Sequence, residues 1–505
     1  MVLARDASAA QALAEPITLP CGRRLPNRLC KAAMEELMST DRLPNKAFNQ
    51  LYQAWGEGGY GMILSGNVQV APKHLGLPFD VAVPKSLRTS SQAMDRFTSW
   101  SASMEVEDTD SQPLRIMQLN HAGRQSMRIM TGRPLSSPSL APSVVQMTAG
   151  NGYLGKLVGK VVWGTPKEMD QGDIDEVIEQ FCRGARLAKE AGWDGVELHS
   201  SHGYLLAQFL SPQTNLRTDD YGGNGRKRIK LLFTIADAIR KEFPLESGFV
   251  LGVKLNASDY IKGGLSEEDA LDNVRWIAEH GGFDFIEISG GSYESPAFLS
   301  TKPSPSKREA FFADFSTRAY DMLNNDLDPE TLPSPKPLIL LTGGFRTRIG
   351  MSKALTGGGS SEDQPVADLI GIGRPSAADP QFGLKMLDSS IRDEEAKIPP
   401  YNPNEGAFMS ILHHLLGWMT LIGPSFDVFY HNMLMHRLAW QNQQGAGKKG
   451  DDEKVKGKSD KLPSFWTLAH ELYIDPYVST NVLRLWIFGL SGVVTYYLLG
   501  RVGLP

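Results

Sequence analysis

The sequence predicts an α/β protein whose main part is a (β/α)8 TIM barrel, followed by a C-terminal helical extension and a hydrophobic tail that is a candidate membrane anchor. Two observations favour this fold class. Eight short apolar runs lack the polar alternation of a half-exposed sheet, as parallel strands buried on both faces do. Amphipathic segments separate most of these runs over about 370 residues, and a strand followed by a helix is the repeating unit of the barrel.

The eight apolar runs are the predicted strands, taken in chain order. They cover residues 28–33, 61–66, 115–120, 195–199, 249–256, 285–289, 337–342 and 367–373. The clearest helical patterns lie at residues 45–55, 86–106, 174–191, 227–243, 267–280, 309–323 and 348–355. Asp173 and Ser266 are suitable N-caps, and Gly192 and Gly281 are suitable C-terminal stops.

The main competitor of a barrel is a doubly wound sheet, which usually carries a glycine-rich phosphate turn after its first strand. Residues 56–61, GEGGYG, have the GxGxxG spacing of such a turn. However, they follow a predicted helix and precede a predicted strand, which is the wrong order for a dinucleotide site. We therefore interpret this string as a helix stop and turn.

Two segments interrupt the barrel pattern. Residues 123–166 are rich in Ser, Pro and Gly and follow the third predicted strand. A long loop at that end of a barrel is usually a lid or a substrate loop. Residues 324–336 are polar and proline-rich, and we interpret them as a surface excursion.

The barrel pattern ends near residue 397, and this divides the chain. Residues 1–400 form the predicted barrel, 401–440 an apolar helical extension, 441–463 a polar linker and 464–505 a hydrophobic tail. The tail contains 16 residues without a charge, at 485–500, whereas a bilayer core requires roughly 20 apolar residues. A transmembrane anchor, a helix packed on the protein or a partner, and an artefact of a wrongly joined gene remain open interpretations.

The composition is that of an ordinary globular protein, with 41% hydrophobic and 22% charged residues. The net charge of −5 argues against a general nucleic-acid footprint, because phosphate binding needs a basic face. Cys21, Cys30 and Cys182 lie far apart, which favours a reducing compartment over a disulfide framework. Residues 1–16 lack the apolar core of a signal peptide. We expect a cytoplasmic protein, tethered to an internal membrane if its tail is an anchor.

The main candidate for chemistry is the stretch HSSHGY, residues 199–204, where the fourth predicted strand ends. Neutral imidazoles each donate one hydrogen bond, so His199 and His202 can hold an oxygen atom and stabilise negative charge on it. Tyr204 is a candidate general acid. Metal binding needs a third and usually a fourth ligand, which is not evident nearby. A purely structural role of the three side chains is the other alternative.

Other strand ends carry residues suited to a polar ligand. Gln118 offers a donor and an acceptor, which suits a heterocycle with a pyrimidine-like edge, although a loop cap is the commoner role. Lys254 lies among apolar residues and needs an anion or a polar ligand there, unless it escapes to the barrel rim. Glycine turns follow the seventh and eighth strands, where barrels often bind phosphate. The phosphate candidates are Gly343, Gly344, Gly373 and Arg374.

Several separated motifs together resemble the Old Yellow Enzyme (NADH:flavin oxidoreductase) family. They are VELHSSHGYLLAQFLSPQTNLRTDDYGG from Val196, Asn27-Arg28 with KAAM from Lys31, QLNHAGRQ from Gln118, VKLNASDY from Val253, TGGF and GIGRP. Their order and spacing match the family over roughly residues 15–395, and several motifs in one order are more specific than any single motif.

The resemblance implies an FMN-binding barrel and a role for each matching residue. His199 and His202 match the pair that binds a substrate carbonyl or the nicotinamide amide, and Tyr204 matches the proton donor. Gln118 and Lys254 match residues that hydrogen-bond the flavin pyrimidine edge, and the glycine turns with Arg374 match the phosphate site. The residues that match the isoalloxazine contacts are Ala32, Ala33, Met34 and Gly66.

The resemblance also implies an activity: an FMN-dependent ene-reductase that reduces α,β-unsaturated carbonyl compounds with NADH or NADPH. An oxidase or demethylase-like flavoprotein and a membrane-tethered, non-catalytic flavin-binding protein are the alternatives. Many relatives place Thr or Cys after the Ala-Ala-Met turn, whereas this chain has Glu35. A carboxylate near the flavin is expected to lower its reduction potential, unless the side chain points away.

Overall fold

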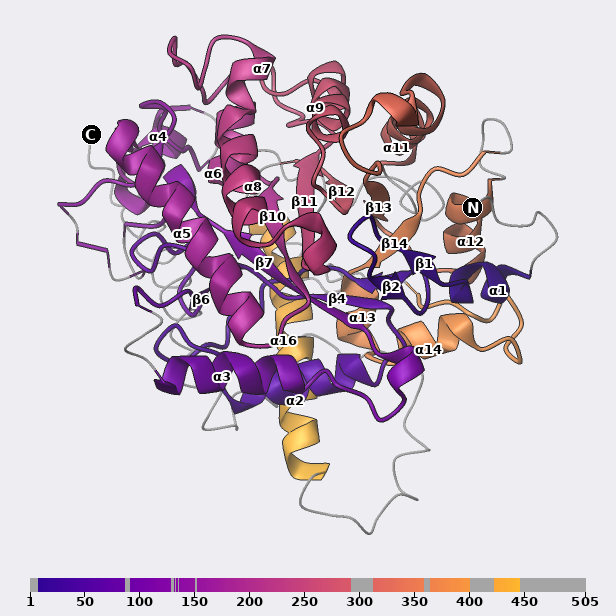
Figure 1. Cartoon of the computed structure of the whole chain (residues 1–505). Helices are drawn as coiled ribbons and strands as arrows, with labels where there is room; N and C mark the ends of the chain where they lie inside the picture. The colour runs from indigo at the N-terminus through magenta and orange to yellow at the C-terminus, as the bar shows by residue number, and fades with distance from the viewer. Residues whose placement is uncertain are drawn as a thin grey trace.

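The barrel of this computed structural model is a closed ring of eight parallel strands (Figure 1). The structure describes residues 8–86, 91–128, 131, 133–134, 136–149, 152–291, 312–357, 364–399 and 422–445. Each strand pairs with the next, and β14 closes the ring by pairing Ile372 with Lys31 of β3. The strands are β3 (Leu29–Lys31), β4 (Met62–Leu64), β7 (Leu114–Asn120), β10 (Gly195–Ser200), β11 (Val250–Asn256), β12 (Phe285–Ser289), β13 (Leu338–Thr342) and β14 (Leu369–Ile372). All eight predicted strands are confirmed.

The two ends of the barrel interior differ in polarity. Apolar side chains fill the amino end, where Leu114, Val250 and Phe285 begin their strands and pack in one cluster. Gly252 makes room for this packing, because a Cβ atom there would lie 2.1 Å from the Phe285 ring. Charged and amide side chains instead occupy the carboxyl end, as described below. This end is where a barrel of this class places its functional residues.

The predicted outer helices are present between the strands (Figure 1). They are α2 (Lys46–Gly56), α3 (Ser91–Ala102), α5 (Gln171–Glu190), α8 (Lys230–Glu242), α9 (Glu267–His280), α11 (Ala313–Asp321) and α12 (Arg348–Thr356). Ser266 caps α9 and Gly281 ends it with φ +79°, as expected. The predicted cap of α5 is wrong by one turn: Asp170 is the N-cap, and Asp173 is its reciprocal partner in a capping box.

Shorter elements link the barrel units. The GxGxxG string is a helix stop and turn, because α2 ends at Gly56 and β4 begins at Met62. The long segment after β7 is partly regular, and the stretch after α11 continues as a π-helical turn, Met322–Asp326, with mostly exposed residues beyond it. The remaining elements include α1 (Ala9–Ala14), β1 (Ile17–Thr18), β2 (Arg24–Leu25), β5 (Val68–Gln69), β6 (Val81–Ala82), β8 (Leu140–Ala141), α4 (Gly152–Val162), β9 (Lys167–Glu168), α6 (Leu205–Leu210), α7 (Gly225–Arg228), α13 (Arg374–Ala378) and α14 (Phe382–Leu387).

A further helix, α16 (Ile422–Gly445), packs against α2 and α13 and is drawn in yellow in Figure 1. The seven residues from Tyr430 to His436 are all buried, and His436 Nε2 lies 3.0 Å from the Glu36 carbonyl oxygen. The helix is therefore an integral part of the packed protein. Across the ranges that the structure describes, we find no helix with the length and apolar character needed to cross a bilayer. The candidate anchor at 485–500 lies outside those ranges, and the domain boundaries remain predictions.

Candidate active site

The predicted site residues converge on the carboxyl end of the barrel. His199 belongs to β10, Gln118 to β7 and Lys254 to β11, while His202 and Tyr204 follow β10 directly. Parallel strands bring their carboxyl ends to the same face, so these side chains share one mouth. The other predicted residues follow the ends of β3, β4, β13 and β14 at the same face, and they are Ala32, Ala33, Met34, Gly66, Gly343, Gly344, Gly373 and Arg374.

The two histidines form a neutral pair of hydrogen-bond donors. Their ring centroids lie 5.2 Å apart with an interplanar angle of 79°. Burial lowers the pKa of both imidazoles well below the usual range, and the charge of Lys254 lowers both further. The Ser201 amide donates to His199 Nδ1 at 3.3 Å, so the neutral His199 ring carries its hydrogen on Nε2. His202 Nε2 lies 2.9 Å from Ser289 Oγ.

Three residues from other strand ends hold His202 in an unusual backbone conformation. Its φ is +56°, a left-handed value that is uncommon for a residue other than glycine. Its amide donates to Asn256 Oδ1 at 3.0 Å, and Gln125 Nε2 donates to its carbonyl at 2.7 Å. Together with Ser289, these contacts fix the ring position despite the backbone strain. Sequence reasoning missed all three contacts, because only barrel closure brings these residues together.

Tyr204 lies beside His199 and is bound by an acid. The two ring centroids are 4.7 Å apart, and the phenol is buried. Tyr204 Oη donates to Glu35 Oε1 at 2.7 Å and accepts from Asn67 Nδ2 at 3.1 Å. Asn67 Nδ2 also donates to Glu35 Oε1 at 2.5 Å. Glu35 is therefore directed at the tyrosine hydroxyl, and the sequence could not show this.

Two buried acids support the amide and the ammonium beneath the histidines. Gln118 Nε2 donates to Glu197 Oε2 at 2.6 Å, and Lys254 Nζ donates to Glu287 Oε1 at 2.8 Å. Burial raises the pKa of Glu197 well above the usual range, and the charge of Glu287 raises it further. Lys254 thus has the anion that its buried position demands and does not escape to the rim. In the sequence, each of these two acids is a single Glu inside an apolar run, and this pattern is the signal that could have revealed them.

The residues at this mouth suit a flavin mononucleotide. Gln118 keeps its carbonyl oxygen and one N–H, and Lys254 keeps two N–H donors, so both can still meet a polar heterocycle edge. At the carboxyl ends of β13 and β14, a Cβ atom on Gly371 would lie 1.8 Å from Thr342 Oγ1, so glycine is needed for the Thr342 side chain to pack there. Thr342 Oγ1 is itself buried without a partner. Gly66 contributes small size rather than a free amide, because its N–H donates to Glu36 Oε1 at 2.9 Å.

A metal site is not supported at the histidine pair. Within the portion of the chain that the structure describes, His199 and His202 are not joined by a third His, Cys, Asp or Glu that could complete a group of metal ligands. The His199 ring instead packs against the Tyr204 ring, with centroids 4.7 Å apart.

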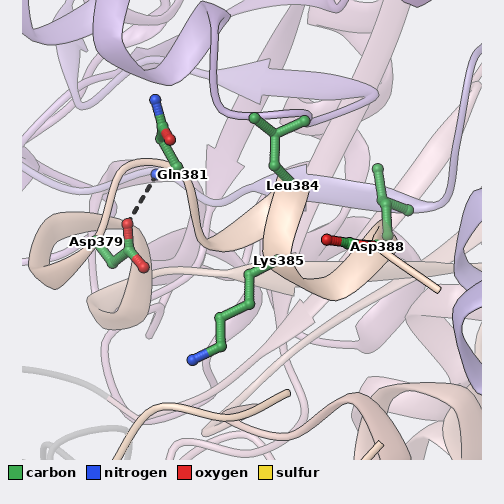
Figure 2. Close-up of a pocket in the computed structure, with 6 residues that line it drawn as sticks. Asp379, Gln381, Leu384, Lys385 and Asp388 are labelled. Atoms are coloured by element: carbon green, nitrogen blue, oxygen red, sulfur yellow. Dashed lines mark hydrogen bonds between the residues drawn. The ribbon is translucent and has the colours of Figure 1, made fainter. Parts of the chain in front are cut away.

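A surface groove of about 560 Å³ surrounds α14 and lies away from this mouth. Figure 2 shows its polar lining, in which the Gln381 amide donates to Asp379 Oδ1 at 3.0 Å. The Leu384 amide donates to the Gly58 carbonyl at 2.9 Å, in the turn that precedes β4. The groove therefore lies at the amino end of the strands, opposite the predicted site.

The paired Lys254 predicts a stability effect. Lys254→Met would leave Glu287 buried without its cation, and breaking one side of a buried ion pair typically costs about 3–5 kcal/mol. We expect this loss in the free energy of unfolding measured by urea denaturation. The exposed Lys241→Met on α8 is the matched control, and the double variant Lys254→Met/Glu287→Leu should recover most of the loss. Equal stability of Lys254→Met and Lys241→Met would show that the pair is not formed.

The sequence is similar to those of known flavin oxidoreductases. Residues 12–393 match the model of the NADH:flavin oxidoreductase / NADH oxidase family. The NADH-dependent flavin oxidoreductase iliE of Neonectria sp. (strain DH2) is 39% identical over 376 residues, which are 72% of this chain and 46% of that protein. The iliE protein of Hypocrea jecorina (strain QM6a) is 37% identical over 398 residues, 77% of this chain and 92% of that protein. The matched region thus spans less than half of the first relative and most of the second.

A solved structure shares the fold. The Old Yellow Enzyme homologue from Zymomonas mobilis superposes with a TM-score of 0.57 at 20% sequence identity. The superposition covers 77% of this chain and 97% of that chain. At this identity the likeness supports the barrel architecture, and the chemistry has to be argued from the side chains at the mouth.

Proposed function

The chain belongs to the NADH:flavin oxidoreductase / NADH oxidase family, and from this premise we propose that it reduces the activated C=C bond of α,β-unsaturated carbonyl compounds. It is an NAD(P)H:flavin oxidoreductase with FMN as cofactor. We infer the substrate class from one observation: a neutral histidine pair and a buried tyrosine lie side by side at the barrel mouth. Such an arrangement offers hydrogen-bond donors for a carbonyl and a proton for carbon on one side of the same mouth.

In this proposal His199 and His202 bind the carbonyl oxygen. Both imidazoles are neutral, so each carries one N–H, and such donors can stabilise negative charge that develops on the oxygen during reduction. Their contacts with Ser201 and Ser289 are already formed, so little reorganisation is needed when a substrate arrives. Polarisation of the carbonyl makes the β-carbon electron-poor.

Tyr204 then gives its proton to the α-carbon. When bound, FMN supplies the hydride that the β-carbon receives. Gln118 and Lys254 would hold the pyrimidine edge of the flavin, and the turns after β13 and β14 with Arg374 would hold its phosphate. Ala32, Ala33, Met34 and Gly66 would line the ring system.

Turnover of 2-cyclohexenone tests this function. Purified protein that carries a yellow flavin should oxidise NADH or NADPH faster when the enone is added under anaerobic conditions, and cyclohexanone should accumulate in equal amount. Reduction of the bound flavin by NAD(P)H without any enone reduction would reject the ene-reductase proposal and favour the oxidase or demethylase-like alternative. Well-folded protein without flavin and without NAD(P)H oxidation would favour the non-catalytic alternative.

The hydrophobic tail adds a proposal about location. We propose that residues 485–500 tether the enzyme to a membrane. A variant that ends after Gly445 keeps all of α16, whose residues Tyr430–His436 are buried against the barrel. We expect the full-length chain in the membrane fraction of a cell lysate and this truncated chain in the supernatant. Equal distribution of the two folded proteins would contradict the tether.

A further inference from the structure

The hydroxyl of Tyr204 has one hydrogen, and in the structure this hydrogen is directed at an acid. Tyr204 Oη donates to Glu35 Oε1 at 2.7 Å, and a hydroxyl cannot donate a second hydrogen bond. While Glu35 is ionised, the hydrogen of Tyr204 is therefore held away from any substrate. If Glu35 carries a proton instead, it can donate to the tyrosine oxygen, and the tyrosine hydrogen becomes available for transfer.

The surroundings of Glu35 suit a group that exchanges protons. Glu35 is half-buried, so solvent reaches this residue, and its carboxylate contacts Tyr204. A second carboxylate, Asp80, lies near Tyr204: its Oδ2 accepts from the Gly76 and Leu77 amides at 2.9 and 3.0 Å, and a Cβ atom on Gly76 would lie 3.4 Å from that oxygen and 3.8 Å from the Tyr204 ring. Burial and the charge of Glu35 raise the pKa of Asp80 well above its usual range. The raised pKa keeps Asp80 protonated, so Asp80 adds no negative charge beside Glu35.

Three further ionisable neighbours face elsewhere or are neutral. His199, which packs on the Tyr204 ring, is uncharged because burial lowers its pKa. Glu36, the next residue in the chain, points to the Tyr52 hydroxyl and the Gly66 amide rather than to Tyr204. Lys31 lies over the Trp55 ring at 3.9 Å and donates to the Leu64 carbonyl. The acid that contacts the Tyr204 hydroxyl is thus Glu35.

We propose that Glu35 is a proton-relay residue that acts through Tyr204, so that protonation of the alkene requires Glu35 in its carboxylic acid form. The inference rests on the proposed function, since it assigns the supply of the proton that Tyr204 gives away. Asn67 positions the pair, because its amide donates to both oxygens.

The alkene gains two electrons with the hydride that the reduced cofactor gives to the β-carbon, and the π bond breaks. Its electron pair forms a bond from the α-carbon to the proton of Tyr204. The proton of Glu35 moves to the tyrosine oxygen, and Glu35 recovers a proton from solvent. The substrate is reduced, the flavin is oxidised, and Tyr204 ends each turnover neutral.

The pH dependence of single-turnover alkene reduction tests the relay. In the wild-type holoenzyme, the rate constant for 2-cyclohexenone should be highest at low pH and fall about tenfold per pH unit above the midpoint at which Glu35 ionises. Glu35→Gln can still donate a hydrogen bond to the tyrosine oxygen, but it cannot ionise. Its rate constant should be flat over the same range, should lie below the wild-type value at low pH because glutamine has no proton to pass on, and should exceed the wild-type value at high pH. Glu35→Asp should restore the slope.

Controls separate the relay from general damage. Glu190→Gln, an exposed change at the end of α5, should keep the wild-type profile. Reduction of the bound flavin by NADH should show the same pH dependence in Glu35→Gln as in the wild type, because this half-reaction uses no proton from Tyr204. A pH slope for alkene reduction in Glu35→Gln that matches the wild type would overturn the relay.

A second readout does not depend on enone turnover. The tyrosinate difference absorbance of each protein, minus that of its Tyr204→Phe counterpart, reports the midpoint at which Tyr204 ionises. Removal of the Glu35 charge should lower this midpoint by about one pH unit or more. If the wild type reduces no enone, the proposed function fails, and this shift still decides whether the two groups share protons. An unchanged midpoint would refute the coupling in either case.

Discussion

Tyr204→Phe is expected to slow reduction of 2-cyclohexenone by the reduced enzyme about 10²–10⁴-fold, the range typical for loss of a general acid. The substitution removes the phenolic hydroxyl of Tyr204, whose ring packs on His199, and leaves the buried ring in place. Protonation of the α-carbon would then depend on water, which reaches this buried position poorly. The measurement is a stopped-flow trace of flavin reoxidation by the enone under anaerobic conditions.

Flavin reduction by NADH should change little in the same variant, because it needs no proton from Tyr204. The matched control is Tyr320→Phe on the outer helix α11, which should leave both half-reactions unchanged. Equal slowing of both half-reactions by Tyr204→Phe would point to a displaced cofactor instead of a lost acid. Unchanged alkene reduction would remove Tyr204 from the proton-donor role.

Local sequence patterns were enough for the architecture. The strand Phe285–Ser289 and the helix Glu267–His280 have the predicted bounds, because unbroken apolar runs and a Ser266 cap are signals carried by neighbouring residues. The predicted start of helix α5 was wrong because two residues, Asp170 and Asp173, are both suitable for the N-cap position. The long segment after β7 was expected as a loop, yet it contains α4, whose glycines at 152, 155 and 159 weakened the helical signal.

The candidate site was visible only in part, for a physical reason. His199, His202 and Tyr204 are close in the chain and mark one strand end, so a motif could reveal them. Their partners cannot be read this way: Glu35 lies 169 residues from Tyr204, and Asn256 lies 54 residues from His202. These contacts exist because the ring of strands closes, and they depend on register and side-chain direction. The place of these three side chains at one strand end was therefore predictable from the sequence, whereas their contacts with Glu35 and Asn256 were not.

Substitution of either histidine of the pair is expected to cause the second large loss of activity. His199→Ala and His202→Ala should each lower kcat/KM for 2-cyclohexenone about 10²–10³-fold, the usual loss when one donor to a developing oxyanion is removed. His199 is the sharper test, because its Nδ1 is fixed by the Ser201 amide and its Nε2 hydrogen is thus committed to the opposite side of the ring. Enone saturation kinetics with NADH measure the effect.

The matched replacements are His199→Asn and His202→Asn, which keep an N–H donor close to the original position and should lose less than the alanine variants. His280→Gln on the outer face of α9, where the ring stacks on Phe233, is the control for a histidine outside the mouth. If the pair binds the carbonyl, the alanine variants lose both affinity and turnover for the enone while NADH still reduces the flavin.

The neutral state of His199 and His202 also predicts how enone reduction by the alanine variants depends on pH. Burial and Lys254 hold the pKa of both imidazoles well below the ordinary value of 6.5. A depressed histidine pKa means that the neutral form persists as pH falls through that value, so lowering the pH to about 5.5 should not charge the pair. The ratio of wild-type activity to the activity of each alanine variant should therefore be nearly constant between pH 5.5 and pH 7. A loss of enone binding that titrates near the ordinary histidine pKa would show that a charged imidazole occupies the mouth, and the neutral clamp would then be wrong.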